Sequence, residues 1–138
     1  MQQELAQSIV GPFYDALNQP ASKDVATLVE KVTSPEWRSY SGETTSKGRD
    51  EFIQQVKGFG KMIPDLSWAV REVLVAGDKV IVRSEASGTP AGDFMGVAGG
   101  GRRFSIMTID IHTIRDNRLV TAHHVEDWAS ALRQLAGR

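Results

Sequence analysis

The sequence predicts an α+β domain in which a curved antiparallel sheet carries helices on one face. Apolar residues follow a helical spacing up to Ile63 and alternate with a period of two after it. Two turn signals, Gly77-Asp78 and Asp116-Asn117, divide the alternating part into two hairpins. We expect both hairpins to join one sheet that has no parallel pair of strands.

Three helices are expected before the strands. Residues 3–18 place apolar side chains on one helical face, and Pro12 predicts a kink or a new start within them. A second helix is predicted over 22–32, with its serine as the N-cap. Residues 37–40 read as a short extended piece, and a third amphipathic helix spans 49–62.

The strands and a last helix follow in order. The first hairpin is predicted over 66–75 and 79–87, and the second over 104–115 and 118–126. Residues 128–135 return to a helical spacing and close the chain. The expected organisation is a single domain over 1–138, because nothing in the chain has the composition of a linker.

A glycine-rich segment, SGTPAGDFMGVAGGGRR, connects the two hairpins. A phosphate-binding loop requires a helix after the glycines, whereas a strand is predicted here. The segment is instead expected to be a mobile connection or a lid, with Phe94 and Met95 as apolar anchors over a pocket.

Composition excludes several classes of protein. The formal net charge of −1 argues against nucleic acid or an anionic membrane as an obligatory partner, since both call for a basic surface. The absence of cysteine excludes disulfides and thiolate metal sites. Because MQQELAQSIV lacks the pattern of a secretory signal and no stretch is apolar enough to span a membrane, a cytoplasmic location is expected.

All three histidines lie close together in the second hairpin. With a two-residue turn, strand alternation places Asp110, His112 and His123 on a mixed polar face and Met107 and His124 on the opposite, apolar face. A metal site of two histidines and one carboxylate is geometrically conceivable on the first face. A polar face at solvent or at a dimer interface is the better supported reading, so no metal is predicted.

In the first hairpin, Arg83 falls opposite Glu72. The favoured interpretation is a cross-strand ion pair on a half-solvated face. The alternative is an arginine held ready for an anionic group of a substrate.

Two segments resemble a known family. PDLSWAVREVLVAGDKVIVRSEASGT and FSIMTIDIHTIRDNRLVTAHHVEDWASALRQL are similar to conserved stretches of the SnoaL-like polyketide and ester cyclases, within the nuclear transport factor two-like superfamily. The resemblance implies a cone-shaped curved sheet with the N-terminal helices packed on its concave face, around a deep apolar pocket. It also implies ring closure by intramolecular aldol condensation without metal or cofactor, and a homodimer formed through the sheet.

The resemblance also implies a catalytic residue. The acid/base carboxylate of these cyclases stands seven residues before the glutamine of a closing Gln-Leu pair, which is Asp127 here. Burial in an apolar pocket would raise the pKa of this carboxylate and make it an effective base. His124 or His112 is expected within hydrogen-bonding distance of it. The alternative interpretation of Asp127 is the N-cap of the last helix.

The remaining site residues are predicted as substrate-binding. The pocket walls are expected to be apolar, with polar groups from the hairpins, and to include Phe13, Trp37, Phe52, Phe59, Met62, Phe94, Met107, Asp110, His123 and Arg83. Pro90 stands where many cyclases carry a histidine, and His123-His124 replace a usual tryptophan. The family's substrate is therefore not carried over.

Three functions follow as hypotheses. The first is cofactor-independent acid/base chemistry, namely aldol-type ring closure, isomerisation or a lyase reaction, on a small apolar carbonyl compound in an enclosed pocket. The second is hydrolysis similar to that of limonene-epoxide hydrolases, if Asp110, Arg83 and Asp127 converge. The third is a non-enzymatic ligand-binding or dimerisation module. A dimer is expected through the sheet face that mixes polar residues with Ile106, Ile114 and Leu119.

Overall fold

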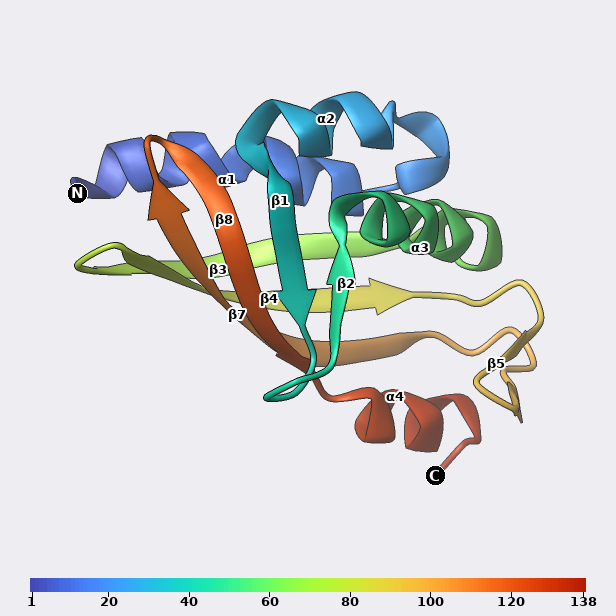
Figure 1. The fold of residues 1–138 in the computed structure, drawn as a ribbon. Helices are drawn as coiled ribbons and strands as arrows, with labels where there is room; N and C mark the ends of the chain where they lie inside the picture. The colour runs from blue at the N-terminus through green and yellow to red at the C-terminus, as the bar shows by residue number, and fades with distance from the viewer.

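The computed structural model describes residues 1–138, and its central feature is a six-stranded curved sheet that wraps around helices (Figure 1). The helices are α1 (Gln3–Leu17), α2 (Val25–Val32), α3 (Arg49–Met62) and α4 (Trp128–Leu135), with a 3₁₀ turn at Pro20–Ser22. The strands are β1 (Thr33–Tyr40), β2 (Ser46–Gly48), β3 (Ser67–Ala76), β4 (Lys79–Gly88), β5 (Asp93–Phe94), β6 (Val97–Ala98), β7 (Phe104–Arg115) and β8 (Arg118–Glu126). The predicted α+β class is confirmed.

The sheet has the strand order β2-β1-β8-β7-β4-β3, and α1, α2 and α3 lie on its concave side (Figure 1). Both predicted hairpins join this sheet. The expectation of no parallel pair is wrong, because β1 runs parallel to β8, with Tyr40 beside His123. The sequence of residues 37–40 does not predict a pairing partner that lies more than 80 positions away along the chain. This pairing covers an edge of β8 that would otherwise expose unpaired backbone groups.

The helices begin and end close to their predicted bounds, with two differences. The first helix continues through Pro12 without a new start. The second begins at Val25 rather than at Ser22, because Ser22 belongs to the 3₁₀ turn and the side chain of Asp24 accepts a hydrogen bond from the backbone N–H of Thr27. Aspartate at this position is as good an N-cap as serine.

The turn of the second hairpin has the expected conformation, with φ of 52° at Asp116 and 61° at Asn117. A β-bulge follows at once: Ile114 pairs with Leu119, but Thr113 pairs with Thr121, which leaves Val120 as an extra residue. From there to its end, β8 is shifted by one residue relative to the simple register. Such a shift moves every following side chain to the other face of the sheet.

The bulge reverses the faces that the sequence assigned to β8. His124 pairs with Asp110, and His123 pairs with Ile111. The face of β7 with Asp110 and His112 points towards the helices, whereas Met107 on the other face is 54% exposed. The polar face, which was expected at solvent or at a dimer interface, therefore faces the helices instead. There its polar groups find hydrogen-bond partners among side chains from α1 and β8.

The hydrophobic core fills the space between the concave face and helices α1–α3. Ile106, Ile114 and Leu119 belong to this core, so the face through which the sequence predicted dimerisation is not available for it. Gly88 marks a close contact in this packing, because a Cβ atom there would lie 2.3 Å from Cγ2 of the buried Ile63. None of the helices has the length and apolar character that a membrane span requires.

The glycine-rich segment contains a small hairpin of β5 and β6. Phe94 is buried against the rings of Phe59, Phe104 and Trp128. Met95 follows with a left-handed backbone at φ 49° and is 52% exposed. Phe94 is therefore an apolar anchor of the segment, as expected, and Met95 is the residue of the pair that reaches the cavity described below.

Candidate active site

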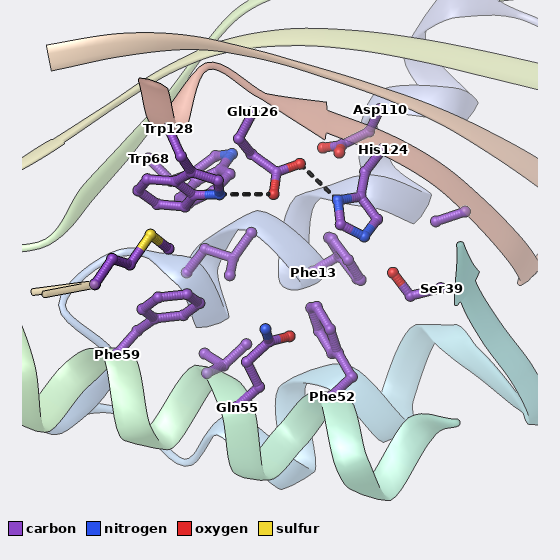
Figure 2. Close-up of a pocket in the computed structure, with 14 residues that line it drawn as sticks. Phe13, Ser39, Phe52, Gln55, Phe59, Trp68, Asp110, His124, Glu126 and Trp128 are labelled. Atoms are coloured by element: carbon purple, nitrogen blue, oxygen red, sulfur yellow. Dashed lines mark hydrogen bonds and ion pairs between the residues drawn. The ribbon is translucent and has the colours of Figure 1, made fainter. Parts of the chain in front are cut away.

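A partly open cavity of about 110 Å³ lies between α1, α3 and the concave face of the sheet (Figure 2). Cavities of this order enclose a molecule of roughly the size of benzene, and the open side leaves room for a somewhat larger ring system. Its apolar lining consists of Phe13, Leu17, Phe52, Val56, Phe59, Trp68, Met95, Ala122 and Trp128. Its polar lining consists of Ser39, Gln55, Asp110, His124 and Glu126. Aromatic rings thus form more than half of the apolar lining, and the ionisable groups come from β7 and β8.

His124 and Glu126 form a charged pair on the cavity side of β8. They are two residues apart in one strand, so their side chains lie on the same face. His124 Nδ1 lies 2.5 Å from Glu126 Oε2, and Trp128 Nε1 donates a hydrogen bond of 3.3 Å to Glu126 Oε1. The hydrogen bond to Glu126 raises the pKa of His124, which favours the imidazolium. Nε2 of His124 points towards the interior of the cavity (Figure 2).

Asp110 lies beside His124, at the paired position of β7. Its side chain is buried, and the residue is 5% exposed. Burial raises the pKa of Asp110 to about 7, although a 2.5 Å hydrogen bond that Tyr14 donates to Oδ2 opposes this shift. A carboxyl group with a pKa close to the ambient pH can both take up and release a proton during a reaction.

The arrangement therefore combines a base and a hydrogen-bond donor in one apolar cavity. Above about pH 7 Asp110 is a carboxylate, and below its own raised pKa His124 carries a proton on both ring nitrogens. The upward shift of the His124 pKa widens the pH range in which these two states occur together. Such a pair can remove a proton from a carbon acid while it stabilises the negative charge that develops on a neighbouring oxygen.

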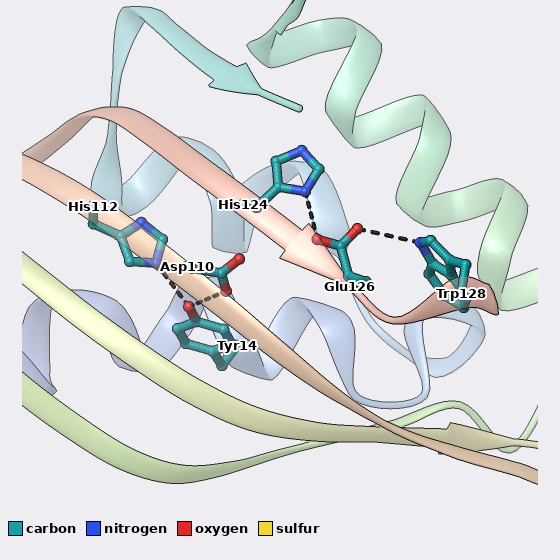
Figure 3. A network of polar contacts seen from close by, with 6 residues as sticks. All are labelled: Tyr14, Asp110, His112, His124, Glu126 and Trp128. Atoms are coloured by element: carbon teal, nitrogen blue, oxygen red, sulfur yellow. Dashed lines mark hydrogen bonds and ion pairs between the residues drawn. The ribbon is translucent and has the colours of Figure 1, made fainter. Parts of the chain in front are cut away.

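His112 lies behind Asp110 and does not line the cavity. It is completely buried, and burial lowers its pKa to about 3, so its imidazole is neutral. Its Nε2 lies 2.7 Å from the Tyr14 hydroxyl oxygen. Figure 3 shows the two separate groups, Tyr14–Asp110–His112 on one side and His124–Glu126–Trp128 on the other.

Asp127, the acid/base that the resemblance implied, is outside the cavity. It is exposed and caps α4, because its side chain accepts hydrogen bonds from the backbone N–H and the hydroxyl group of Ser130. These bonds lower the pKa of Asp127, whereas a raised value was expected. The expectation that its carboxylate reaches the cavity is wrong, and the alternative, a helix N-cap, is confirmed.

We expect Asp127→Asn to leave activity unchanged within about twofold, because asparagine keeps a good N-cap and no carboxylate of the cavity is removed. Turnover and thermal unfolding of the variant, measured side by side with the wild type, check this. A loss of turnover of a hundredfold or more at unchanged stability would show that Asp127 takes part in the reaction.

Three other predicted site residues lie on the outer side of the sheet. Met107 is exposed there, and His123 stacks on Tyr40 with ring centroids 4.9 Å apart. Arg83 forms the favoured ion pair with Glu72, at 3.1 Å. With Arg83 and Asp127 outside the cavity, the set that an epoxide-hydrolase mechanism requires does not converge. No group of three or more His, Cys, Asp or Glu side chains is arranged to hold a metal ion.

Among the predicted wall residues, Phe13, Phe52 and Phe59 line the cavity. Trp37, Met62 and Phe94 do not line it but support it from the core. The ring of Trp37, for example, packs edge-on against Phe13 and Phe52, which fixes both walls.

The sequence did not predict several residues of the candidate site. Glu126 could have been found, since strand alternation places it on the same face as His124. Tyr14 stands on the apolar face of α1, where a buried hydroxyl group usually finds a polar partner. Ser39 and Trp68 come from β1 and β3, and no local pattern brings these positions to the cavity.

The comparisons with known proteins agree with this architecture. A family model described as SnoaL-like polyketide cyclase matches residues 10–135. TsrD from Streptomyces laurentii superposes with a TM-score of 0.84 at 25% identity, over 100% of this chain and 99% of that protein. IdmH from Streptomyces antibioticus gives 0.81 at 24% identity, over 97% and 99%. A SnoaL-like polyketide cyclase from Agrobacterium tumefaciens gives 0.76 at 19% identity, over 98% and 99%.

A search among curated protein sequences found no match. The structures below 25% identity support the fold alone, whereas the family model covers most of the chain. With its curved sheet, its concave-side helices and its lined cavity, the chain belongs to the SnoaL-like polyketide cyclase family.

Proposed function

We propose that the protein is a cofactor-independent acid/base enzyme that removes a proton next to the carbonyl group of a small apolar compound. Ring closure of the aldol type, isomerisation and elimination all begin with this step. The observation that supports it most directly is the pairing of Asp110 with His124 across β7 and β8, with both side chains lining an aromatic cavity.

In this mechanism Asp110 takes the proton from the carbon next to the carbonyl group. The electron pair of the broken C–H bond moves onto the carbonyl oxygen, which becomes an enolate oxygen. His124 donates a hydrogen bond from Nε2 to that oxygen, and Glu126 keeps the imidazolium charged. Transfer of the proton from Asp110 to carbon or oxygen restores the site. In a water-poor cavity such a preorganised donor is worth more than in bulk solvent.

The walls favour a flat apolar substrate. The rings of Phe13 and Phe52 are stacked with centroids 5.3 Å apart, and Phe59 stacks on Trp128 at 5.8 Å. Aromatic walls bind a planar, unsaturated molecule through offset stacking and edge contacts. The ionisable groups Asp110, His124 and Glu126 lie on the sheet side of the cavity (Figure 2), so the carbonyl group of the substrate is expected there.

The test is exchange of carbon-bound hydrogen, which needs no knowledge of the natural substrate. 2-Indanone, a flat apolar ketone, is incubated with the protein in ²H₂O, and loss of the signal of the hydrogens next to its carbonyl group is followed by ¹H NMR. We expect faster exchange than in buffer, with the same rate for Asp127→Asn. A rate equal to that of buffer alone would contradict the proposal.

We also propose a homodimer, formed by the outer face of the sheet. This face exposes large apolar side chains, with Met107 54%, Ile111 40% and Val125 65% exposed. A shallow groove beside them is lined by Tyr40, His123 and neighbouring residues. Isolated exposed apolar residues are common, but a contiguous set on one sheet face is typical of an interface.

Val125→Glu is expected to dissociate this dimer. A two-fold interface would place the new carboxylate on both copies in an apolar contact, which weakens association by about a hundredfold or more. Light scattering at micromolar concentration measures the mass. Val70→Glu, at an exposed valine of β3, is the matched control and should remain dimeric. A monomeric mass for the wild type would contradict the proposal.

A further inference from the structure

The buried pair of His112 and Tyr14 has no role in the reaction described so far. His112 is completely buried, and Tyr14 is 3% exposed. Besides packing in the core, the two residues form a polar contact, because each directs a polar atom at the other. Polar groups in such a place are costly unless they are satisfied. Their position directly behind Asp110 indicates that they act on this carboxylate (Figure 3).

The hydrogen bonds have only one consistent direction when Asp110 is charged. Nδ1 of His112 is sealed from solvent and has no partner. A neutral imidazole carries one proton, and a buried N–H donor without an acceptor is rarer in proteins than an acceptor without a donor. The proton therefore belongs on Nε2, which donates to the Tyr14 oxygen. The single Tyr14 proton is then directed to Asp110 Oδ2, 2.5 Å away.

The same arrangement divides the two oxygens of Asp110 between two tasks. Oδ2 is occupied by Tyr14. Oδ1 has no hydrogen-bond partner in the protein and is not fully buried. It lies on the side of the carboxylate away from Tyr14 (Figure 3). Since Asp110 lines the cavity, Oδ1 is the atom that a substrate meets.

We propose that His112 and Tyr14 are positioning residues, which form a one-way hydrogen-bond chain from His112 Nε2 through the Tyr14 hydroxyl group to Asp110 Oδ2 and present Oδ1 to the cavity as the proton acceptor. This rests on the proposed role of Asp110 as the base. The chain fixes the rotamer of the carboxylate and stabilises its charged form, since hydrogen bonds to a carboxylate strengthen one another in a buried chain.

The chain makes a prediction about proton uptake. The other ionisable groups that face Asp110 are His124 and Glu126 on β8, and they are unchanged by a substitution on α1. Tyr14→Phe removes the hydrogen bond to Oδ2 and keeps the aromatic ring. The bond from Tyr14 lowers the pKa of Asp110, so its loss raises that pKa. The same shift should appear in the acid limb of the pH profile of 2-indanone exchange.

The first experiment reads the tautomer of His112 in the wild type. Long-range ¹H–¹⁵N NMR spectra of uniformly ¹⁵N-labelled protein distinguish the two ring nitrogens, and His112→Gln assigns the signals. We expect a proton on Nε2 and none on Nδ1 at pH 8 to 9, where Asp110 is charged. A proton on Nδ1, or an imidazolium in this range, would overturn the chain.

The second experiment titrates Asp110 by ¹³C NMR of its carboxyl carbon in substrate-free protein. Tyr14→Phe should move the midpoint from about 7 to a value roughly one pH unit higher. Tyr40→Phe, a matched control on the outer face, should leave it unchanged. An unchanged midpoint in Tyr14→Phe would overturn the proposal. Because both experiments lack substrate, a protein that shows these results but exchanges no ketone hydrogen would confirm the chain and refute only the proposed function.

Discussion

Asp110→Asn is expected to lower turnover by roughly 10²–10⁴-fold and, at pH 8, to raise the melting temperature. The loss of turnover follows because the amide cannot accept the substrate proton, although its oxygen can still accept the hydrogen bond from Tyr14. The variant keeps the shape of the side chain, so the cavity and its aromatic walls should be preserved.

The gain in stability follows from the pKa of Asp110, which is about 7 in the folded protein and well above the usual 3.8 of a solvated aspartate. Between these values the folded state holds a proton that the unfolded chain has released, so stability falls as the pH rises from about 4 to about 7. The total loss is on the order of a few kcal/mol. Asparagine is neutral throughout and avoids it, and the difference in melting temperature should therefore disappear near pH 4.

Turnover and melting curves at pH 4 and pH 8 test both parts, with Asp127→Asn as the matched control at an exposed aspartate. If Asp110→Asn retains turnover, Asp110 is not the base. If the variant melts at the same temperature as the wild type at pH 8, burial of the charged Asp110 carboxylate does not lower the stability of the folded protein. Such an exchange of stability for activity is common at functional sites.

Local patterns predicted most of the fold. The bounds of α3, α4, β7 and β8 agree with those expected from apolar spacing and turn residues, because the periods of helices and strands differ and the turns are marked. The parallel pairing of β1 with β8 could not be predicted in this way. It depends on which distant segment covers an open strand edge, and no local pattern contains that information.

In the candidate site, a shift of one residue in the register of a strand decides which side chains face the cavity. The sequence singled out Asp110 and His124 but assigned them to opposite faces, because one extra residue at Val120 shifts the register of β8. The spacing to the closing Gln-Leu pair selected Asp127, which caps α4, whereas the carboxylate of the neighbouring Glu126 faces the cavity. Adjacent residues in an extended chain point in opposite directions, so an error of one position exchanges a site residue for a surface residue.

Glu126→Gln is expected to move the alkaline limb of the pH–rate profile to lower pH and to reduce kcat/KM at pH 8 by about tenfold or more. The hydrogen bond and charge of Glu126 raise the pKa of His124, while burial of the imidazole lowers it. Without the carboxylate the effect of burial prevails, and each pH unit above the midpoint reduces the protonated fraction about tenfold. Glutamine can still accept the hydrogen bond from Trp128, so the geometry of the wall is kept.

The sign of the effect separates an electrostatic role of Glu126 from a structural one. In the proposed mechanism Asp110 must be deprotonated and His124 protonated, so the profile is expected to rise through the pKa of Asp110 and to fall through that of His124. A structural defect would lower the whole profile without moving its alkaline limb. Glu85→Gln, which removes an exposed ion pair with Arg71 at 3.0 Å, is the matched control and should leave the profile unchanged. An alkaline limb that stays in place in Glu126→Gln would mean that the imidazolium of His124 is not the group that stabilises the enolate oxygen.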